Sequence, residues 1–184
     1  MIAAVWNLPN QLTIARLILA ILLFCLIPWG HYLAANVIFC LAAGTDWLDG
    51  YLARKWGQVT VFGRILDPFV DKVLICGAFI MLAAIAGSGI ASWMAVLVTG
   101  RELLVTTIRS FLEAAGKDFS AKWSGKIKMG LQCAAVIASL VALQYGAQTL
   151  PPWLALSLPV LVWGAVLSTV YSGVIYIFAA GRLV

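Results

Sequence analysis

Long apolar runs, separated by short clusters of turn-forming residues, are the main pattern along this chain. Glycine and proline clusters interrupt the runs at residues 28–30, 87–89 and 146–152, as is typical where helices end. A helix that spans a membrane needs about 20 apolar residues. The pattern therefore predicts an all-α integral membrane protein with six transmembrane helices, at residues 12–29, 32–52, 68–86, 91–108, 127–145 and 153–178.

The composition agrees with a membrane protein that forms a single domain, residues 1–184. Hydrophobic residues make up 64% and charged residues 10% of the chain, and the mean hydropathy is +1.03. All four cysteines fall within apolar segments, which indicates small buried side chains rather than a disulfide framework or a metal cluster. Arg16 inside the first apolar segment, with no basic region before it, favours a retained helix over a signal peptide.

The distribution of positive charge predicts how the helices are oriented. Lys and Arg gather in or beside the second-to-third and fourth-to-fifth links and near the chain ends, whereas the other three links contain neither. Because cytosolic loops carry an excess of these residues, both termini are expected on the cytosolic side of the cell inner (plasma) membrane. The net charge of +5 would attract anionic headgroups and anionic substrates to that face.

Four of the seven acidic residues lie in one stretch, DWLDGYLARKWGQVTVFGRILDPFVD, at residues 46–71. The first two share a face of one helix, and the last two, four residues apart, share a face of the next. If these helices pack antiparallel, all four carboxylates converge in a polar cavity on the cytosolic side. Carboxylates this close need cations to stay ionised, and oxygen ligands without Cys or His suit Mg²⁺ or Mn²⁺ in a two-metal site. The predicted metal ligands are Asp46, Asp49, Asp67 and Asp71.

The same stretch matches the signature of a known family. It reads DxxDGxxAR from Asp46 to Arg54 and, after eight further residues, GxxxDxxxD from Gly63 to Asp71. At every defined position this resembles the CDP-alcohol phosphotransferases. The resemblance implies a transferase that acts on CDP-diacylglycerol, with Asp71 as general base besides its role as metal ligand, and a homodimer. It also implies contacts with the CDP-lipid for Asn10, Thr13, Gly50, Arg54, Thr60 and Gly63.

Ordinary structural roles remain open for several of these polar residues. Asn10 fits the N-cap of the first helix, and Arg16 fits a side chain that extends to lipid phosphates. Arg54 fits a positively charged anchor at the cytosolic interface. Asp67 before Pro68 is typical of a helix start, although that role would not explain an aspartate one turn further into a membrane helix.

A second group of charged residues lies in the fourth and fifth segments. Arg101 and Arg109 share a helix face at i and i+8, and Arg101 lies about 15 Å along its segment. With Lys126 and Lys128 they predict a basic pocket that binds a phosphate-bearing acceptor. The runs RELLVTTIR and GKIK resemble the phosphatidylglycerophosphate synthase branch of the family. That resemblance implies transfer of a phosphatidyl group to glycerol 3-phosphate, with release of CMP.

Two alternatives stay open from the sequence alone. Within the family the acceptor could be a phosphatidylglycerol, an inositol phosphate or serine, although a basic pocket weighs against serine. From another class, the aspartates could line a divalent-cation transporter, although the acids gather at one membrane face beside a glycine and an arginine suited to a nucleotide.

His31 lies between the first two helices, away from the acidic stretch, and is expected to be interfacial rather than a ligand. No nucleic-acid partner is expected.

Overall fold

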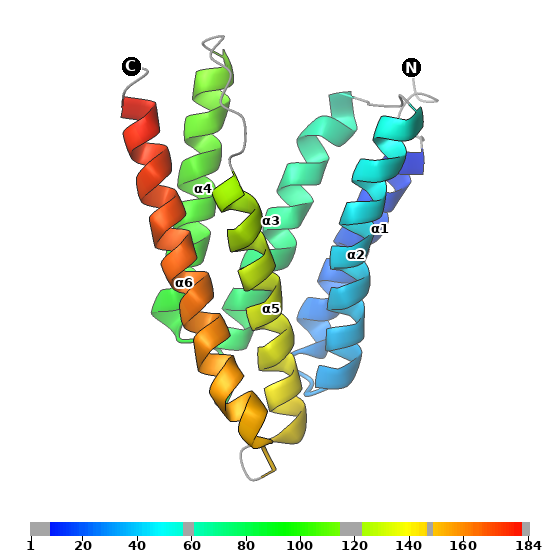
Figure 1. The fold of residues 1–184 in the computed structure, drawn as a ribbon. Coiled ribbons are helices and arrows are strands. Elements are labelled where there is room, and N and C mark those ends of the chain that lie inside the picture. The colour runs from blue at the N-terminus through cyan, green and yellow to red at the C-terminus, as the bar shows by residue number, and fades with distance from the viewer. Residues whose placement is uncertain (1–7, 57–60, 115–122, 147–148, 182–184) are drawn as a thin grey trace. The chain divides into compact units, whose positions relative to one another are not determined.

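A computed structural model describes residues 8–56, 61–114, 123–146 and 149–181, and within them it contains six α-helices and no strand. Side chains are described except at residues 8–10, 46–56, 61–65, 113–114, 123–124 and 179. The all-α prediction is confirmed. The helices are α1 Leu8–Leu26, α2 Tyr32–Trp56, α3 Val61–Ala83, α4 Ser92–Ala114, α5 Trp123–Tyr145 and α6 Pro152–Gly181 (Figure 1).

The predicted breaks between apolar runs coincide with helix ends. Gly30 follows α1 with φ of 75°, and Gly146 follows α5 with φ of 72°. These left-handed conformations cost glycine little because it has no Cβ. The Gly146 amide donates to the Ala142 carbonyl at 3.0 Å, which satisfies an acceptor at the end of α5.

Several helices extend beyond their predicted bounds, and two capping interpretations are wrong. Because α1 begins at Leu8, Asn10 lies inside its first turn instead of capping it. Because α3 begins at Val61, Asp67 lies well inside this helix and Pro68 is an internal proline. Polar or charged residues bounded most of the apolar runs from which the helix bounds were predicted. Such residues are compatible with a helix, so the helices continue through them.

The chain divides into two compact units, and the first comprises residues 1–81. In this unit α1 and α2 pack side by side (Figure 1). The core includes Leu23, Ile27, Phe39 and Phe79, all fully buried. Gly77 of α3 lies so close to the ring of Phe24 that an added Cβ would overlap it, so the glycine leaves room for this side chain of α1 against α3.

The second unit comprises residues 82–184, and α6 packs against both α4 and α5 in it (Figure 1). Polar side chains lie inside this packing. Gln132 of α5 donates to the Thr169 hydroxyl of α6 at 3.1 Å, and both residues are buried. Such hydrogen bonds join helices where no water competes.

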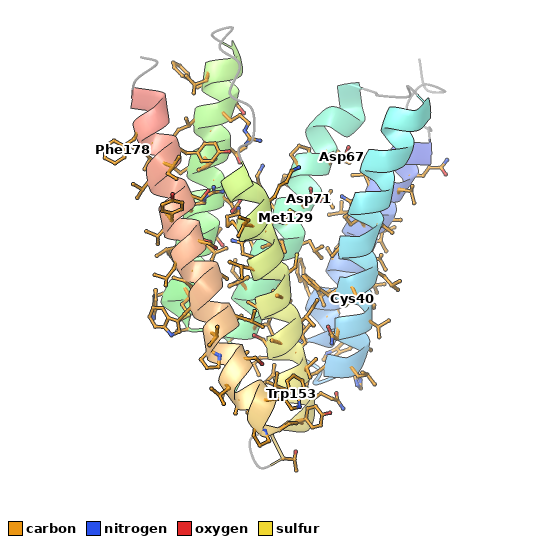
Figure 2. All side chains as sticks on the ribbon, in the orientation of Figure 1. Cys40, Asp67, Asp71, Met129, Trp153 and Phe178 are labelled. Carbon is orange, nitrogen blue, oxygen red and sulfur yellow. The ribbon has the colours of Figure 1, made fainter. Side chains whose placement is uncertain are left out.

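Large apolar side chains cover the outside of the helices. Val96 is 71% exposed, Leu156 is 72% exposed and Phe178, which points away from α4 and α5 in Figure 2, is 70% exposed. Residues 125–145 and 152–178 form two helical segments long and apolar enough to cross a membrane. Apolar residues outside and polar residues inside are typical of a protein that lies in lipid.

Candidate active site

Two aspartates of α3 face α1 in the first unit. Asp67 and Asp71 lie one turn apart on α3 (Figure 2). The Thr13 hydroxyl of α1 donates to Asp67 Oδ1 at 2.5 Å, and Arg16 Nη1 donates to Asp71 Oδ1 at 2.7 Å. Thr13 and Arg16 are three residues apart on α1, so two matched pairs join one face of each helix.

Arg16 is enclosed by the protein. Its side chain is 0% exposed, whereas that of Asp71 is 26% exposed. The interpretation of Arg16 as a side chain that extends to lipid phosphates is therefore wrong. A buried guanidinium needs a partner of opposite charge, and the Asp71 carboxylate supplies it while remaining partly accessible.

The two described carboxylates of this site are chemically suitable ligands for a divalent cation. Asp67 and Asp71 present hard oxygen donors from one helix face, and both hydrogen bonds from α1 use their Oδ1 atoms. Among the described residues, no three His, Cys, Asp or Glu side chains form a group that could hold a metal. The other predicted members lie outside the described side chains, namely Asp46, Asp49, Gly50, Arg54, Thr60, Gly63 and Asn10.

In the second unit, three predicted cations and one carboxylate are linked through α4, α5 and α6. The Glu102 carboxylate accepts from Arg101 Nη1 at 3.1 Å and also from Lys128 Nζ. Glu102 is 12% exposed and Lys128 is 7% exposed in their side chains. A single glutamate thus joins one cation of α4 to one of α5 in an environment where unpaired charge is costly.

The side chains of Arg101 and Arg109 meet at α6. The Arg101 guanidinium carbon lies 5.5 Å from the centroid of the Tyr176 ring, and that of Arg109 lies 5.9 Å from it. Arg109 Nη2 donates to the Tyr176 hydroxyl at 3.2 Å, and Arg101 Nη2 donates to the Ser172 hydroxyl. The prediction that Arg101 and Arg109 share one helix face is confirmed by this common partner.

This basic cluster, defined as Arg101, Arg109, Lys128 and Glu102, has a surplus of positive charge. Three cations and one carboxylate leave a net charge of +2. The Nε atoms of Arg101 and Arg109 are buried and have no hydrogen-bond partner within the described residues. Buried donors and surplus charge favour an anion as ligand, and a phosphate monoester carries about −2 at neutral pH.

Lys126 differs from the other predicted cations. It is exposed, whereas Lys128 is buried. Residues two apart on a helix point to nearly opposite sides. Lys128 faces Glu102, so Lys126 points away from it.

Sequence reasoning missed Ser172 and Tyr176 because they lie about 70 residues from their arginine partners in an apolar segment. A signal was present in their spacing. Thr169, Ser172, Gly173 and Tyr176 stand at i, i+3, i+4 and i+7 in the largely apolar helix α6, which places small and polar residues on one face. A polar stripe within a membrane helix indicates a functional or packing surface.

Comparison with known proteins places this arrangement in a family. The family model described as CDP-alcohol phosphatidyltransferase matches residues 6–171. The chain belongs to this family, and it is therefore a transferase by class. The family prediction made from the aspartate spacing is confirmed.

Individual relatives extend over most of the chain. A protein of Bacillus subtilis strain 168 named CDP-diacylglycerol–glycerol-3-phosphate 3-phosphatidyltransferase is 36% identical over 91% of this chain and 92% of its own length. Proteins of the same name from Escherichia coli K12 and Shigella flexneri serotype 5b are each 39% identical over 71% of this chain and 75% of their own length.

Proposed function

We propose that this protein transfers the phosphatidyl group of CDP-diacylglycerol to sn-glycerol 3-phosphate, forming phosphatidylglycerophosphate and CMP. The observation that carries the proposal is similarity, over 91% and 71% of this chain, to two relatives named for this reaction. The basic cluster supports it, because buried positive charge suits an acceptor that carries phosphate. The family match favours a transferase over a divalent-cation transporter.

Asp71 is proposed as the general base. Its carboxylate would take the proton of the acceptor hydroxyl, and the hydroxyl oxygen would form a bond to the phosphorus that carries diacylglycerol. The bond from that phosphorus to CMP would break, and CMP would leave with the electron pair. Arg16 supports this role because its ion pair with Oδ1 orients the carboxylate.

Thr13 is proposed to orient Asp67 in the same way, through the hydrogen bond from its hydroxyl. Asp46, Asp49, Asp67 and Asp71 would hold Mg²⁺ or Mn²⁺, which when bound would neutralise charge on the diphosphate. Asn10, Gly50, Arg54, Thr60 and Gly63 remain proposed contacts of the CDP-lipid, on the strength of the family signature.

We propose that all six helices cross the cell inner membrane and that the polar site and both termini are cytosolic. The exposed apolar side chains support a lipid environment. The concentration of Lys and Arg beside alternate links supports the orientation. We also propose a homodimer, which crosslinking in membranes would check.

The test of the proposed function is CMP release by the purified protein with CDP-diacylglycerol and Mg²⁺. Glycerol 3-phosphate, inositol phosphate, serine and phosphatidylglycerol are offered in separate reactions. Turnover with glycerol 3-phosphate alone is expected, and the lipid product should carry a terminal phosphate. Turnover only with another acceptor would contradict the proposed acceptor and retain the transferase class. A parallel series with EDTA checks the proposed metal requirement, with loss of CMP release expected.

A further inference from the structure

Tyr176 is the common contact of two arginines that would otherwise repel each other. Its side chain is buried, with 3% of the residue exposed. Both guanidinium carbons lie within 6 Å of the centroid of its ring, a distance at which a ring face attracts a cation. Its hydroxyl also accepts a hydrogen bond from Arg109. One side chain of α6 therefore offers attraction to both cations of α4.

Alignment of the two guanidinium groups requires more than their spacing on α4. Residues eight apart are separated by about 12 Å along a helix axis, and long arginine side chains have many rotamers. Ser172 and Glu102 fix Arg101 from two sides. Within the described residues, the polar contact of Arg109 is with Tyr176, so the position of its guanidinium depends on this ring and hydroxyl.

We propose that Tyr176 is a positioning residue, which holds Arg101 and Arg109 in the arrangement that binds the phosphate of the acceptor. This inference rests on the proposed function, since it takes the anion to be the phosphate monoester of the acceptor. Tyr176 acts through the arginines: it fixes donors that would otherwise lose conformational freedom when the ligand binds.

Two variants separate the hydroxyl from the ring. Tyr176→Phe retains the ring and removes the hydrogen bond to Arg109, whereas Tyr176→Leu removes both interactions. The KM for glycerol 3-phosphate is expected to rise about threefold to tenfold in Tyr176→Phe and about tenfold to hundredfold in Tyr176→Leu. The KM for CDP-diacylglycerol should change less than about twofold.

Tyr171 provides a matched control on the same helix. It lies five residues before Tyr176 and is 65% exposed, so Tyr171→Leu repeats the substitution outside the basic cluster. This variant is expected to keep both KM values. Equal increases of both KM values in Tyr176→Leu, or an increase of the same size in Tyr171→Leu, would overturn the positioning role, because either result would indicate a general structural effect.

A second readout separates this inference from the proposed function. Inorganic phosphate should raise the melting temperature of the wild-type protein, and this increase should be smaller in Tyr176→Phe and absent in Tyr176→Leu. The wild type could turn over glycerol 3-phosphate while both variants keep the wild-type KM for this acceptor and the wild-type stabilisation by phosphate. That result would refute the role of Tyr176 but not the proposed function. Lack of wild-type turnover with glycerol 3-phosphate would refute the proposed acceptor. If Tyr176→Leu does not fold, Tyr176→Phe decides, since it removes one oxygen atom.

Discussion

Lys126 and Lys128 lie two residues apart on α5 and have different surroundings. Lys128 is buried and donates to Glu102, whereas Lys126 is exposed. Removing a buried cation from a hydrogen-bonded charge pair leaves its partner poorly compensated. The basic cluster would also fall from a net charge of +2 to +1. The two lysines should therefore differ in their effect on the acceptor.

The substitutions Lys128→Met and Lys126→Met test this difference. Lys128→Met is expected to raise the KM for glycerol 3-phosphate about tenfold to hundredfold. Lys126→Met should raise it less than about threefold, because exposed charges contribute little. Steady-state kinetics with each substrate varied in turn give both KM values. An equal or larger effect of Lys126→Met would show that the exposed lysine, rather than the buried one, contacts the acceptor.

Asp67→Asn and Asp71→Asn test the acidic site. Each change keeps the shape of the side chain and removes the negative charge. CMP release should fall at least about a hundredfold, since general base catalysis alone typically contributes about 10²- to 10⁴-fold. Melting curves and gel filtration check that each variant remains folded. Near-normal turnover by folded Asp71→Asn would exclude this residue as the base.

At the scale of helices, the apolar pattern predicted all six elements, but not where the charged ends of the helices lie. Arg54 and Lys55 fall in the last turn of α2, and Arg64 in the first turn of α3. Apolar periodicity reports burial in lipid or protein, so it stops where the chain becomes charged. Backbone hydrogen bonding does not depend on that boundary, and the helix continues beyond it.

The candidate site was predictable to the extent that its residues carry charge. Arg101 and Arg109 lie on one helix, so their common face follows from a period of 3.6 residues. Ser172 and Tyr176 come from another helix, and their contact with the arginines depends on how α4 packs against α6. Helix periodicity within one sequence does not specify which helices become neighbours. The pairing of Arg16 with Asp71 was missed for the same reason.

The packing of the Phe24 ring of α1 against Gly77 of α3 gives a prediction about stability. Gly77→Ala would place a methyl group against the ring of Phe24. Overpacking of this kind costs about 1 to 3 kcal/mol, so the melting temperature in detergent should fall. Gly44→Ala is the control, because an added Cβ in this exposed part of α2 meets no atom within 4 Å. That variant should be as stable as the wild type or slightly more stable. Equal melting temperatures for both variants would contradict the close packing.

At the scale of the whole molecule, the proposed function requires a defined orientation in the membrane. Glycerol 3-phosphate and the nucleotide of CDP-diacylglycerol are polar, and their chemistry belongs on an aqueous face. The six crossings proposed would place both termini on the same side. Lys and Arg beside alternate links indicate that this side is cytosolic. This orientation requires every helix to cross the membrane, and among the described residues two segments meet the criteria of length and apolarity by themselves.

Cysteine labelling tests the number of crossings and the orientation together. In a variant without the four native cysteines, His31→Cys and Gly181→Cys place single thiols at exposed positions after α1 and at the end of α6. A membrane-impermeant maleimide should label His31→Cys in intact cells and Gly181→Cys only after permeabilisation. The reverse pattern would place the termini outside. Labelling of both thiols from outside would mean that the chain crosses the membrane an even number of times between residues 31 and 181. At least one of the five helices α2–α6 would then not span the membrane. Retained CMP release by each variant ensures that the labelled protein has its native fold.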